Sequence, residues 1–214
     1  MINKLSPLPE FLVRGYKKWK SSAYLENEKK FKELASFGQN PKAMIISCCD
    51  SRVHATSIFG ANEGYFFIHR NIANLVPSYS ADFVNYGTTA ALEYAIKGLK
   101  IQHLIILGHR NCGGIKHGHK MHSSILNPDY EYLNKWLSML LPAFNNIKKN
   151  TEEKEQIDQL EKESIKVSVK NLYSFPFVKK AVKDKKLSIH GLIHDIGSGD
   201  LKFLNPLTDE FENL

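Results

Sequence analysis

Cysteine is scarce in this chain: only three of its 214 residues are cysteines, and two of those are adjacent. Three cysteines make a poor disulfide framework, so we expect reduced thiols and a cytoplasmic location. No segment approaches the roughly 18–20 consecutive apolar residues of a membrane span, and residues 1–20 lack the apolar stretch of a secretory signal. Internal repeats and Pro/Gly/Ser-rich linkers are absent too. These features predict a single domain over residues 1–214 with no membrane partner.

The formal net charge is +7, a value that raises the question of a nucleic-acid partner. The lysines are spread along the chain, however, and many stand beside glutamates, as in the segment 152–162. No nucleic-acid-binding motif accompanies them. We therefore expect no nucleic-acid partner, although the positive field would attract small anions.

The order of the apolar segments predicts strands that alternate with helices. Strands are expected at 43–48, 65–69, 101–108, 187–196 and 202–204, the last of them at an edge after a turn at 197–199. Helical patterns cover 11–19, 26–37, 82–97 and 130–172. This alternation is typical of an α/β fold with a mainly parallel central sheet flanked by helices.

Three local signals refine the helices. Asp82 is expected to cap the helix 82–97, Gly98 to end it, and Pro142 to open a new helix rather than lie inside one. The face of the helix 82–97 toward the core is expected to carry Phe83, Tyr86, Ala90, Tyr94 and Leu99.

All three cysteines lie in two short runs, each of which follows a predicted buried strand. One run is Cys48-Cys49-Asp50-Ser51-Arg52, and the other extends from Gly108 to Gly114 with His109 and Cys112. Side chains alternate along an extended chain, so Cys48 points to the same side as Asp50 and Arg52 while Cys49 points away. His109 and Cys112, spaced i and i+3, converge if a helical turn begins after Gly108. Two thiolates and one imidazole suit Zn²⁺, and three ligands leave the fourth position free for chemistry.

Other interpretations of these residues are weaker. Buried cysteines often act as small apolar residues, and a single member of the set would be assigned to packing. A structural zinc site with three cysteines would need Cys48 and Cys49 on the same ion, which strand alternation opposes. A cysteine-dependent phosphatase would place its arginine at a different spacing from the thiol than the four positions that separate Arg52 from Cys48.

The sequence resembles the β-class carbonic anhydrases from about Pro41 to Gly199. The matching segments are Cys48-x-Asp50-Ser51-Arg52, Phe67 to Pro77 (FIHRNIANLVP), Ala91-Leu92-Glu93-Tyr94-Ala95, Gly108-His109-x-x-Cys112-Gly113-Gly114 and Ile189-His190-Gly191. In spacing and order this set is highly specific.

The resemblance implies a role for each matching residue. Cys48, His109 and Cys112 would bind one Zn²⁺ per chain, and Asp50 with Arg52 would form a catalytic dyad. A small substrate pocket, partly across a dimer interface, would be lined by Asn62, Phe67, Tyr94 and Gly113. The helices of residues 1–40 would form an arm that extends onto a neighbouring subunit, and residues 41–200 would form the zinc-binding α/β core. The protein is therefore expected to be a homo-oligomer, at least a dimer.

Three positions depart from the family pattern. Plant-like members carry Gln where this chain has Asn62, so a hydrogen bond to the substrate would be shorter or lost. A subgroup regulated by bicarbonate carries Trp where this chain has Ile45, and Ser47 replaces a common glycine. We therefore do not expect that form of allosteric control.

The reaction implied is the reversible hydration of carbon dioxide to bicarbonate and a proton by zinc-bound hydroxide. Arg52 would hold Asp50 off the metal so that water takes the fourth position. In a closed state Asp50 would itself be the fourth ligand, and rising pH would favour the open state. Two alternatives stay open: a hydrolase of carbonyl sulfide or carbon disulfide on the same zinc site, and a low-turnover zinc-binding regulatory protein.

The remaining histidines and polar residues receive structural assignments. His54 and His69 are expected to be packed or surface residues, Cys49 to be packed, and Arg70 with Asn71 to brace the site in a buried network. The residues His117, His119 and His122 are expected on a solvated loop or helix surface, and His190 and His194 in a strand.

Overall fold

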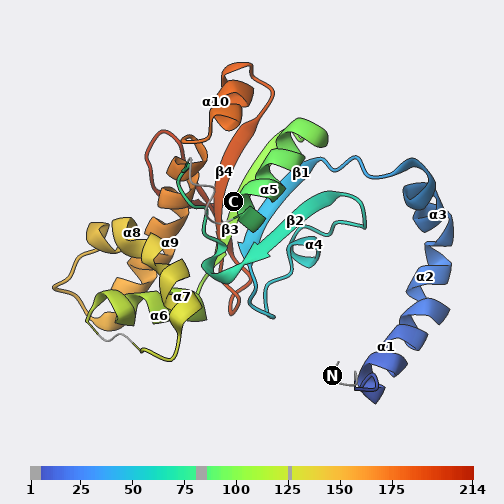
Figure 1. Ribbon diagram of the computed structural model, residues 1–214, viewed down its shortest axis with the longest axis horizontal. Coiled ribbons are helices and arrows are strands. Elements are labelled where there is room, and N and C mark those ends of the chain that lie inside the picture. Colours follow the sequence, from blue (N-terminus) through green and yellow to red (C-terminus); the bar gives the residue numbers. More distant parts are fainter. Residues whose placement is uncertain (1–5, 81–85, 125–126) are drawn as a thin grey trace, which may run out of the picture. The chain divides into compact units, whose positions relative to one another are not determined.

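A computed structural model describes residues 6–80, 86–124 and 127–214 of the chain. The chain divides into two compact units with a boundary between Asn40 and Pro41. In the second unit the described residues form one six-stranded sheet with the order β2-β1-β3-β4-β5-β6 (Figure 1). No described helix is both long and apolar enough to cross a membrane.

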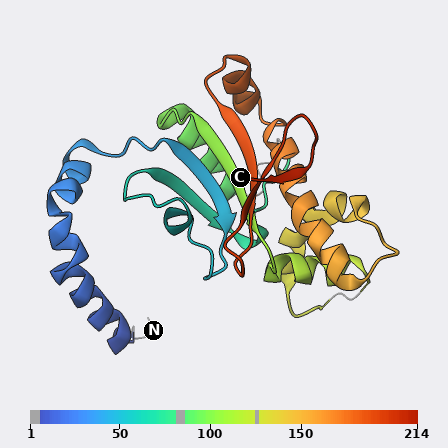
Figure 2. The ribbon, with the colours of Figure 1, turned by 180° about the vertical axis from the view of Figure 1, so that it is seen from behind.

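The first four strands in the sheet order are parallel, as the sequence predicts. The strands are β1 (Ala43–Cys48), β2 (Phe66–Asn71), β3 (His103–His109), β4 (Ser188–His194), β5 (Leu201–Leu204) and β6 (Phe211–Asn213). β5 pairs antiparallel with β4, and β6 pairs antiparallel with β5, at one end of the sheet. Figure 2 shows β5 and β6 in red, with the molecule seen from behind. The strand β6 was not predicted, and it takes the edge position expected for 202–204. All six residues of β1 are buried, which explains their uninterrupted apolar character.

Helices cover both faces of the sheet. On one face, Met44 and Ile106 pack beneath α5 (Tyr86–Glu93), α9 (Glu153–Leu172) and α10 (Pro176–Lys183). On the other face, Ile45 and Leu107 pack with the short helix α4 (Ala55–Ile58). A further apolar cluster joins α6 (Gly113–His122), α7 (Glu131–Leu137) and α8 (Leu141–Asn146) to α9. α8 has proline in its first turn, as expected for Pro142.

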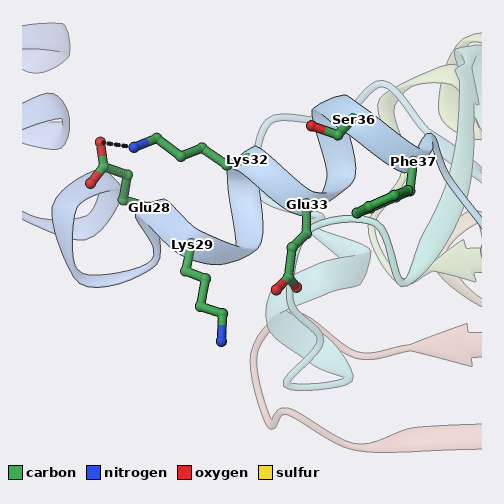
Figure 3. A pocket seen from close by; sticks show the side chains of 6 residues that line it. All are labelled: Glu28, Lys29, Lys32, Glu33, Ser36 and Phe37. Carbon is green, nitrogen blue, oxygen red and sulfur yellow. Dashed lines mark ion pairs between the residues drawn. The ribbon is translucent and has the colours of Figure 1, made fainter.

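The first unit contains α1 (Glu10–Ser21), α2 (Ala23–Glu26) and α3 (Glu28–Phe37), followed by Gly38 with a positive φ of 79°. No residue of these three helices is buried. Figure 3 shows a pocket on α3 lined by Glu28, Lys29, Lys32, Glu33, Ser36 and Phe37. Its lining consists of charged surface side chains, an ion pair between Glu28 and Lys32, and the exposed Phe37.

The predicted core-facing side of the helix 82–97 is wrong for Ala90 and Tyr94, whereas Leu99 packs against the core as expected. Thr88, Leu92 and Ala95 are buried, whereas Ala90 is exposed and Tyr94 is 53% exposed. The helix carries small and apolar residues on more than one side, so periodicity alone did not identify the buried face. Asp82 and Phe83 lie outside the described residues. Leu99 follows a short π-helical turn, Tyr94–Gly98, which ends at the expected glycine.

Gly108 allows α9 to lie close against β3, because a Cβ atom there would stand 2.6 Å from Ile165 Cδ1 and 2.9 Å from Ile165 Cγ1. We expect Gly108→Ala to lower the free energy of unfolding by about 1–3 kcal/mol through overpacking. Gly87→Ala is the matched control, since nothing lies within 4 Å of its Cβ position and alanine is favoured over glycine in a helix. Chemical denaturation measures both variants. Equal stability of Gly108→Ala and the wild type would contradict this packing.

Candidate metal centre

The ends of two adjacent parallel strands bring the predicted ligands together. Cys48 is the last residue of β1, His109 is the last residue of β3, and Cys112 precedes the first turn of α6. One potential ligand atom from each of the three lies within 4.8 Å of the others, and all three residues are buried. We call Cys48, His109 and Cys112 the metal-binding group. It is the one such group found among the described residues, and it does not include Asp50.

The donor set fits zinc. The Sγ atoms of Cys48 and Cys112 are 3.8 Å apart, too far for a disulfide bond, which needs about 2.05 Å. Two sulfurs bound tetrahedrally to zinc at about 2.3 Å each would be about 3.8 Å apart. His109 Nε2 is buried without a hydrogen-bond partner, while its Nδ1 contacts the carbonyl oxygen of Arg110 at 3.0 Å. The contact of Nδ1 with the Arg110 carbonyl oxygen orients the His109 ring and leaves Nε2 free to bind a metal.

The arrangement favours the ionised form of one of the two sulfurs, that of Cys48. The hydrogen bond from Cys112 lowers the pKa of Cys48 well below its usual range, while the same shared proton raises the pKa of Cys112. Burial alone would lower the pKa of His109, but the neighbouring Cys48 sulfur raises it overall. A divalent cation at this position would replace the shared proton, since thiolates are the form that binds metal.

Asp50 is held by Arg52 beside these ligands. The Arg52 side chain donates from Nε to Oδ1 at 2.9 Å and from Nη2 to Oδ2 at 2.7 Å, and its backbone N–H also reaches Oδ1 at 3.0 Å. Arg52 Nη2 contacts the carbonyl oxygen of Asn111 in the other loop. These hydrogen bonds hold the pKa of the Asp50 carboxyl well below its usual range. Asp50 Oδ2 lies 3.9 Å from His109 Nε2, so an ionised carboxylate stands next to the metal-binding group.

Arg70 braces the loop that follows β1. Its guanidinium donates to the carbonyl oxygens of Cys48, Asp50 and Val53 at 3.0, 2.8 and 3.0 Å. Asn71 bonds both the N–H and the carbonyl oxygen of Leu75. The expected bracing network is therefore present.

Cys49 is exposed, and the expectation that it would be packed is wrong. β1 ends at Cys48, so the chain leaves the buried sheet before Cys49 and turns its side chain into a shallow pocket shared with His69 and Trp136. Cys49 is absent from the metal-binding group.

The structure brings some of the expected pocket residues together. Phe67 in β2 and Tyr94 have ring centroids 5.8 Å apart, and Gly113 follows Cys112 as the first residue of α6. Asn62 is exposed in the segment between α4 and β2. Phe67 is partly buried against the core beneath α5, so it presents an apolar wall.

The expectation of a solvated surface is wrong for His119 of α6, which is buried, while His117 and His122 are partly exposed. His117 contacts Asn134 Oδ1, His119 contacts Gln156 Oε1, and His122 contacts the Leu137 carbonyl oxygen. These contacts attach α6 to α7 and α9. His69 contacts Thr88 and is thus packed, His54 is exposed, and His190 and His194 lie in β4, all as expected.

The sequence interpretation missed Glu161, which lies in α9 with its side chain 1% exposed. Glu161 Oε1 accepts a hydrogen bond from the backbone N–H of Cys112 at 3.0 Å. Burial raises the pKa of Glu161 to about 7, against the opposing effects of the Cys112 N–H and the charge of Arg110. A signal existed in the sequence: Glu161 follows Ile157 by four positions and precedes Ile165 by four, which places it on the apolar stripe of the helix.

Comparisons with known proteins agree with this geometry. A family model described as carbonic anhydrase matches residues 43–201. Beta carbonic anhydrase 3 of Arabidopsis thaliana is 36% identical over 201 residues, which span 92% of this chain and 76% of that protein. The structure of the β-carbonic anhydrase CcaA has a TM-score of 0.85 at 28% identity and covers 96% of this chain and 91% of its own. A tetrameric β-carbonic anhydrase of Sordaria macrospora has a TM-score of 0.77 at 30% identity, with coverages of 91% and 95%. The chain belongs to the β-class carbonic anhydrase family, as its motifs predict.

Proposed function

We propose that this protein catalyses the reversible hydration of carbon dioxide to bicarbonate and a proton, with one zinc ion held by Cys48, His109 and Cys112. The observation that carries the proposal is the buried group of two thiols and one imidazole with an Asp50–Arg52 pair beside it. A zinc ion that only binds or stabilises has no use for that pair. The hydrolase and regulatory alternatives are not favoured, because the relatives are named as carbonic anhydrases.

Zinc held by these residues would make a coordinated water acidic enough to react near neutral pH, as in carbonic anhydrases that use three histidine ligands. Two thiolate ligands cancel the charge of Zn²⁺, so the chain's own residues must contribute more than they do around three neutral imidazoles. Asp50 is the group positioned to contribute, because its carboxylate stands beside the metal-binding group in ionised form.

Arg52 determines what Asp50 can do. Its guanidinium holds both carboxylate oxygens, which would keep Asp50 off a bound zinc ion and leave the fourth position to water. Held in this way, the Asp50 carboxylate would accept a hydrogen bond from a water on the zinc ion and so act as the positioned proton acceptor. Without this restraint the carboxylate would be free to take the fourth position itself, which is the closed state.

The substrate pocket would combine an apolar wall with few polar groups. Phe67 and Tyr94 supply the wall against which carbon dioxide lies, and Asn62 and Gly113 would bound the pocket at its other sides. Bicarbonate has a full charge and finds little to hold it on apolar surface, so it would leave and be replaced by water. The proton released would pass to solvent.

The zinc assignment and the role of Asp50 are tested together by metal analysis and carbon dioxide hydration kinetics. We expect one zinc per chain in the wild type and in Cys49→Ser, the matched control, and loss of zinc in Cys48→Ser. Asp50→Asn should retain zinc and lose about 10²-fold or more in kcat, the scale of a positioned proton acceptor. An active wild type free of zinc would overturn the proposal.

The pH dependence follows from the Asp50–Arg52 pair. Arg52 lowers the pKa of Asp50, so Asp50 is ionised throughout the range from pH 6 to 9 and does not itself titrate there. An ionised Asp50 that leaves Arg52 would compete for the fourth zinc position, and rising pH would favour hydroxide over it there, so we expect the rate to rise with pH over this range. In Arg52→Ala the freed carboxylate competes better, and the midpoint of the rise should move up by about one pH unit.

A stopped-flow pH–rate profile of the two proteins measures this shift. A flat wild-type profile from pH 6 to 9, or an unchanged midpoint in Arg52→Ala, would contradict the proposed switch.

We also infer that the helices α1–α3 pack on a neighbouring copy of the chain. The apolar side chains of α1 gather on one side of the helix, and Phe11, Leu12, Tyr16 and Trp19 are 41–66% exposed. Such a set of exposed apolar residues needs a covering surface. The relative from Sordaria macrospora is described as tetrameric, which supports assembly of this chain into a homo-oligomer. The exposed Tyr94 is the pocket residue that a second subunit would cover.

Charge placed on the apolar side of α1 should weaken assembly. We expect Leu12→Glu to shift the particle mass toward smaller species, because a buried unpaired carboxylate is costly. Lys17→Glu is the matched control, since Lys17 lies on the opposite side of the same helix by the 3.6-residue period. Size-exclusion chromatography with light scattering measures the masses. Equal masses for Leu12→Glu and the wild type would contradict the arm's role.

A further inference from the structure

Glu161 joins the helix α9 to a predicted zinc ligand. Its carboxylate is buried, and Oε1 accepts the backbone N–H of Cys112 at 3.0 Å. Cys112 stands at the N-terminal end of α6, where the first backbone N–H groups have no partner within the helix. No side chain of the N-cap residue bonds that end. The sulfur of Cys112 is required for the metal and does not cap the helix. The Glu161 carboxylate supplies the acceptor for the Cys112 N–H instead.

Arg110 fixes the position of this carboxylate. Arg110 Nη1 forms an ion pair with Glu161 Oε2 at 3.0 Å, and Nη2 forms another with Asp158 Oδ2 at 2.5 Å. The backbone of Arg110 is held as well, since its N–H donates to the carbonyl oxygen of His194 and its own carbonyl oxygen contacts His109 Nδ1. The residue between the two ligands thus connects the His109 ring to the carboxylate that holds Cys112.

The loop between the ligands needs such restraint. Asn111 has a φ of +58°, a left-handed conformation that asparagine adopts more readily than other non-glycine residues, although still at some cost. This conformation turns the chain so that His109 and Cys112 face the same point. A conformation of this kind persists only where the surroundings hold it, and the contact from α9 lies at the next residue.

We propose that Glu161 is a positioning residue of the metal centre: oriented by Arg110, its carboxylate holds the Cys112 N–H and thereby the Cys112 sulfur where zinc needs it. The inference rests on the proposed function in that zinc is the metal. Glu161 does not touch the metal, because it is not part of the metal-binding group. Its effect is carried by the backbone N–H of a ligand, whereas the usual partners behind a metal site bond a ligand's side chain.

The test compares variants of Glu161 with a variant of Glu163, which lies two residues along the same helix and pairs with Lys166 at the surface. Glu161→Gln keeps the shape of the side chain but has one acceptor oxygen where glutamate has two. It therefore loses either the hydrogen bond from the Cys112 N–H or the contact with Arg110. Glu161→Leu removes both contacts. Glu163→Gln is the control and should behave as wild type.

The readout is the rate of zinc release to an excess of chelator from each purified holoenzyme, together with the absorption spectrum of the cobalt-substituted protein. We expect release to be faster by about 10-fold in Glu161→Gln and by about 100-fold in Glu161→Leu, the range found for residues behind metal ligands. The cobalt–thiolate bands of both variants should shift. If Glu161→Leu does not fold, Glu161→Gln and Arg110→Lys carry the test, since lysine cannot reach both carboxylates.

Unfolding of the same proteins separates positioning from stability alone. Lower stability with wild-type zinc release and an unchanged cobalt spectrum would overturn the inference, because Glu161 would then serve only to attach α9. A wild type that contains no zinc would overturn both this inference and the proposed function. A wild type that holds zinc but does not hydrate carbon dioxide would overturn the function alone, and the release rates would still decide the role of Glu161.

Discussion

The parallel pairing of β1 with β3 is the interaction on which the metal centre depends. The register places Ser47 opposite Leu107, so both strands end at the same edge, with Cys48 and His109 as their last residues. Parallel strands direct their carboxyl ends to one side of a sheet, and open α/β sheets bind their ligands there. A slip of one residue would turn one set of side chains to the opposite face. The complete burial of β1 opposes such a slip, so the packing of the sheet also sets the ligand geometry.

The helix α9 links that packing to the site. Ile165 covers Gly108 at a distance that leaves no room for a side chain there, and Glu161 lies one turn earlier on the same side of the helix. The apolar contact sets how close α9 lies to β3, and this closeness decides whether the Glu161 carboxylate reaches the N–H of Cys112. Core packing and ligand positioning are therefore not separable in this part of the molecule.

Local signals made the strands and the metal-binding group predictable. Continuous apolar runs identify buried strands, and soft ligands directly after two of them identify Cys48, His109 and Cys112. The sequence contains no comparable local signal for contacts between segments that are distant along the chain. The spacing of Glu161 from Ile157 and Ile165 indicates that it is buried, but its partners, the Cys112 N–H and Arg110, are known only once α9 is placed against the loop. The histidines of α6 look solvated until α7 and α9 supply their partners. Cys49 was misassigned because the sequence does not show that β1 stops one residue before it.

The use of arginine shows how the loops of the site are held. The chain has four arginines among 29 cationic side chains, and three of the four contact the two loops that carry the ligands. Arg52 holds Asp50 with two nitrogens, Arg70 bonds three backbone carbonyls, and Arg110 spans two carboxylates. Each task needs several donors in a fixed plane, which a guanidinium has and an ammonium lacks. Apart from Arg14 in α1, the cationic side chains elsewhere in the chain are lysines, which cannot make several contacts in one plane. The positions of the arginines therefore mark where geometry, rather than charge alone, is required.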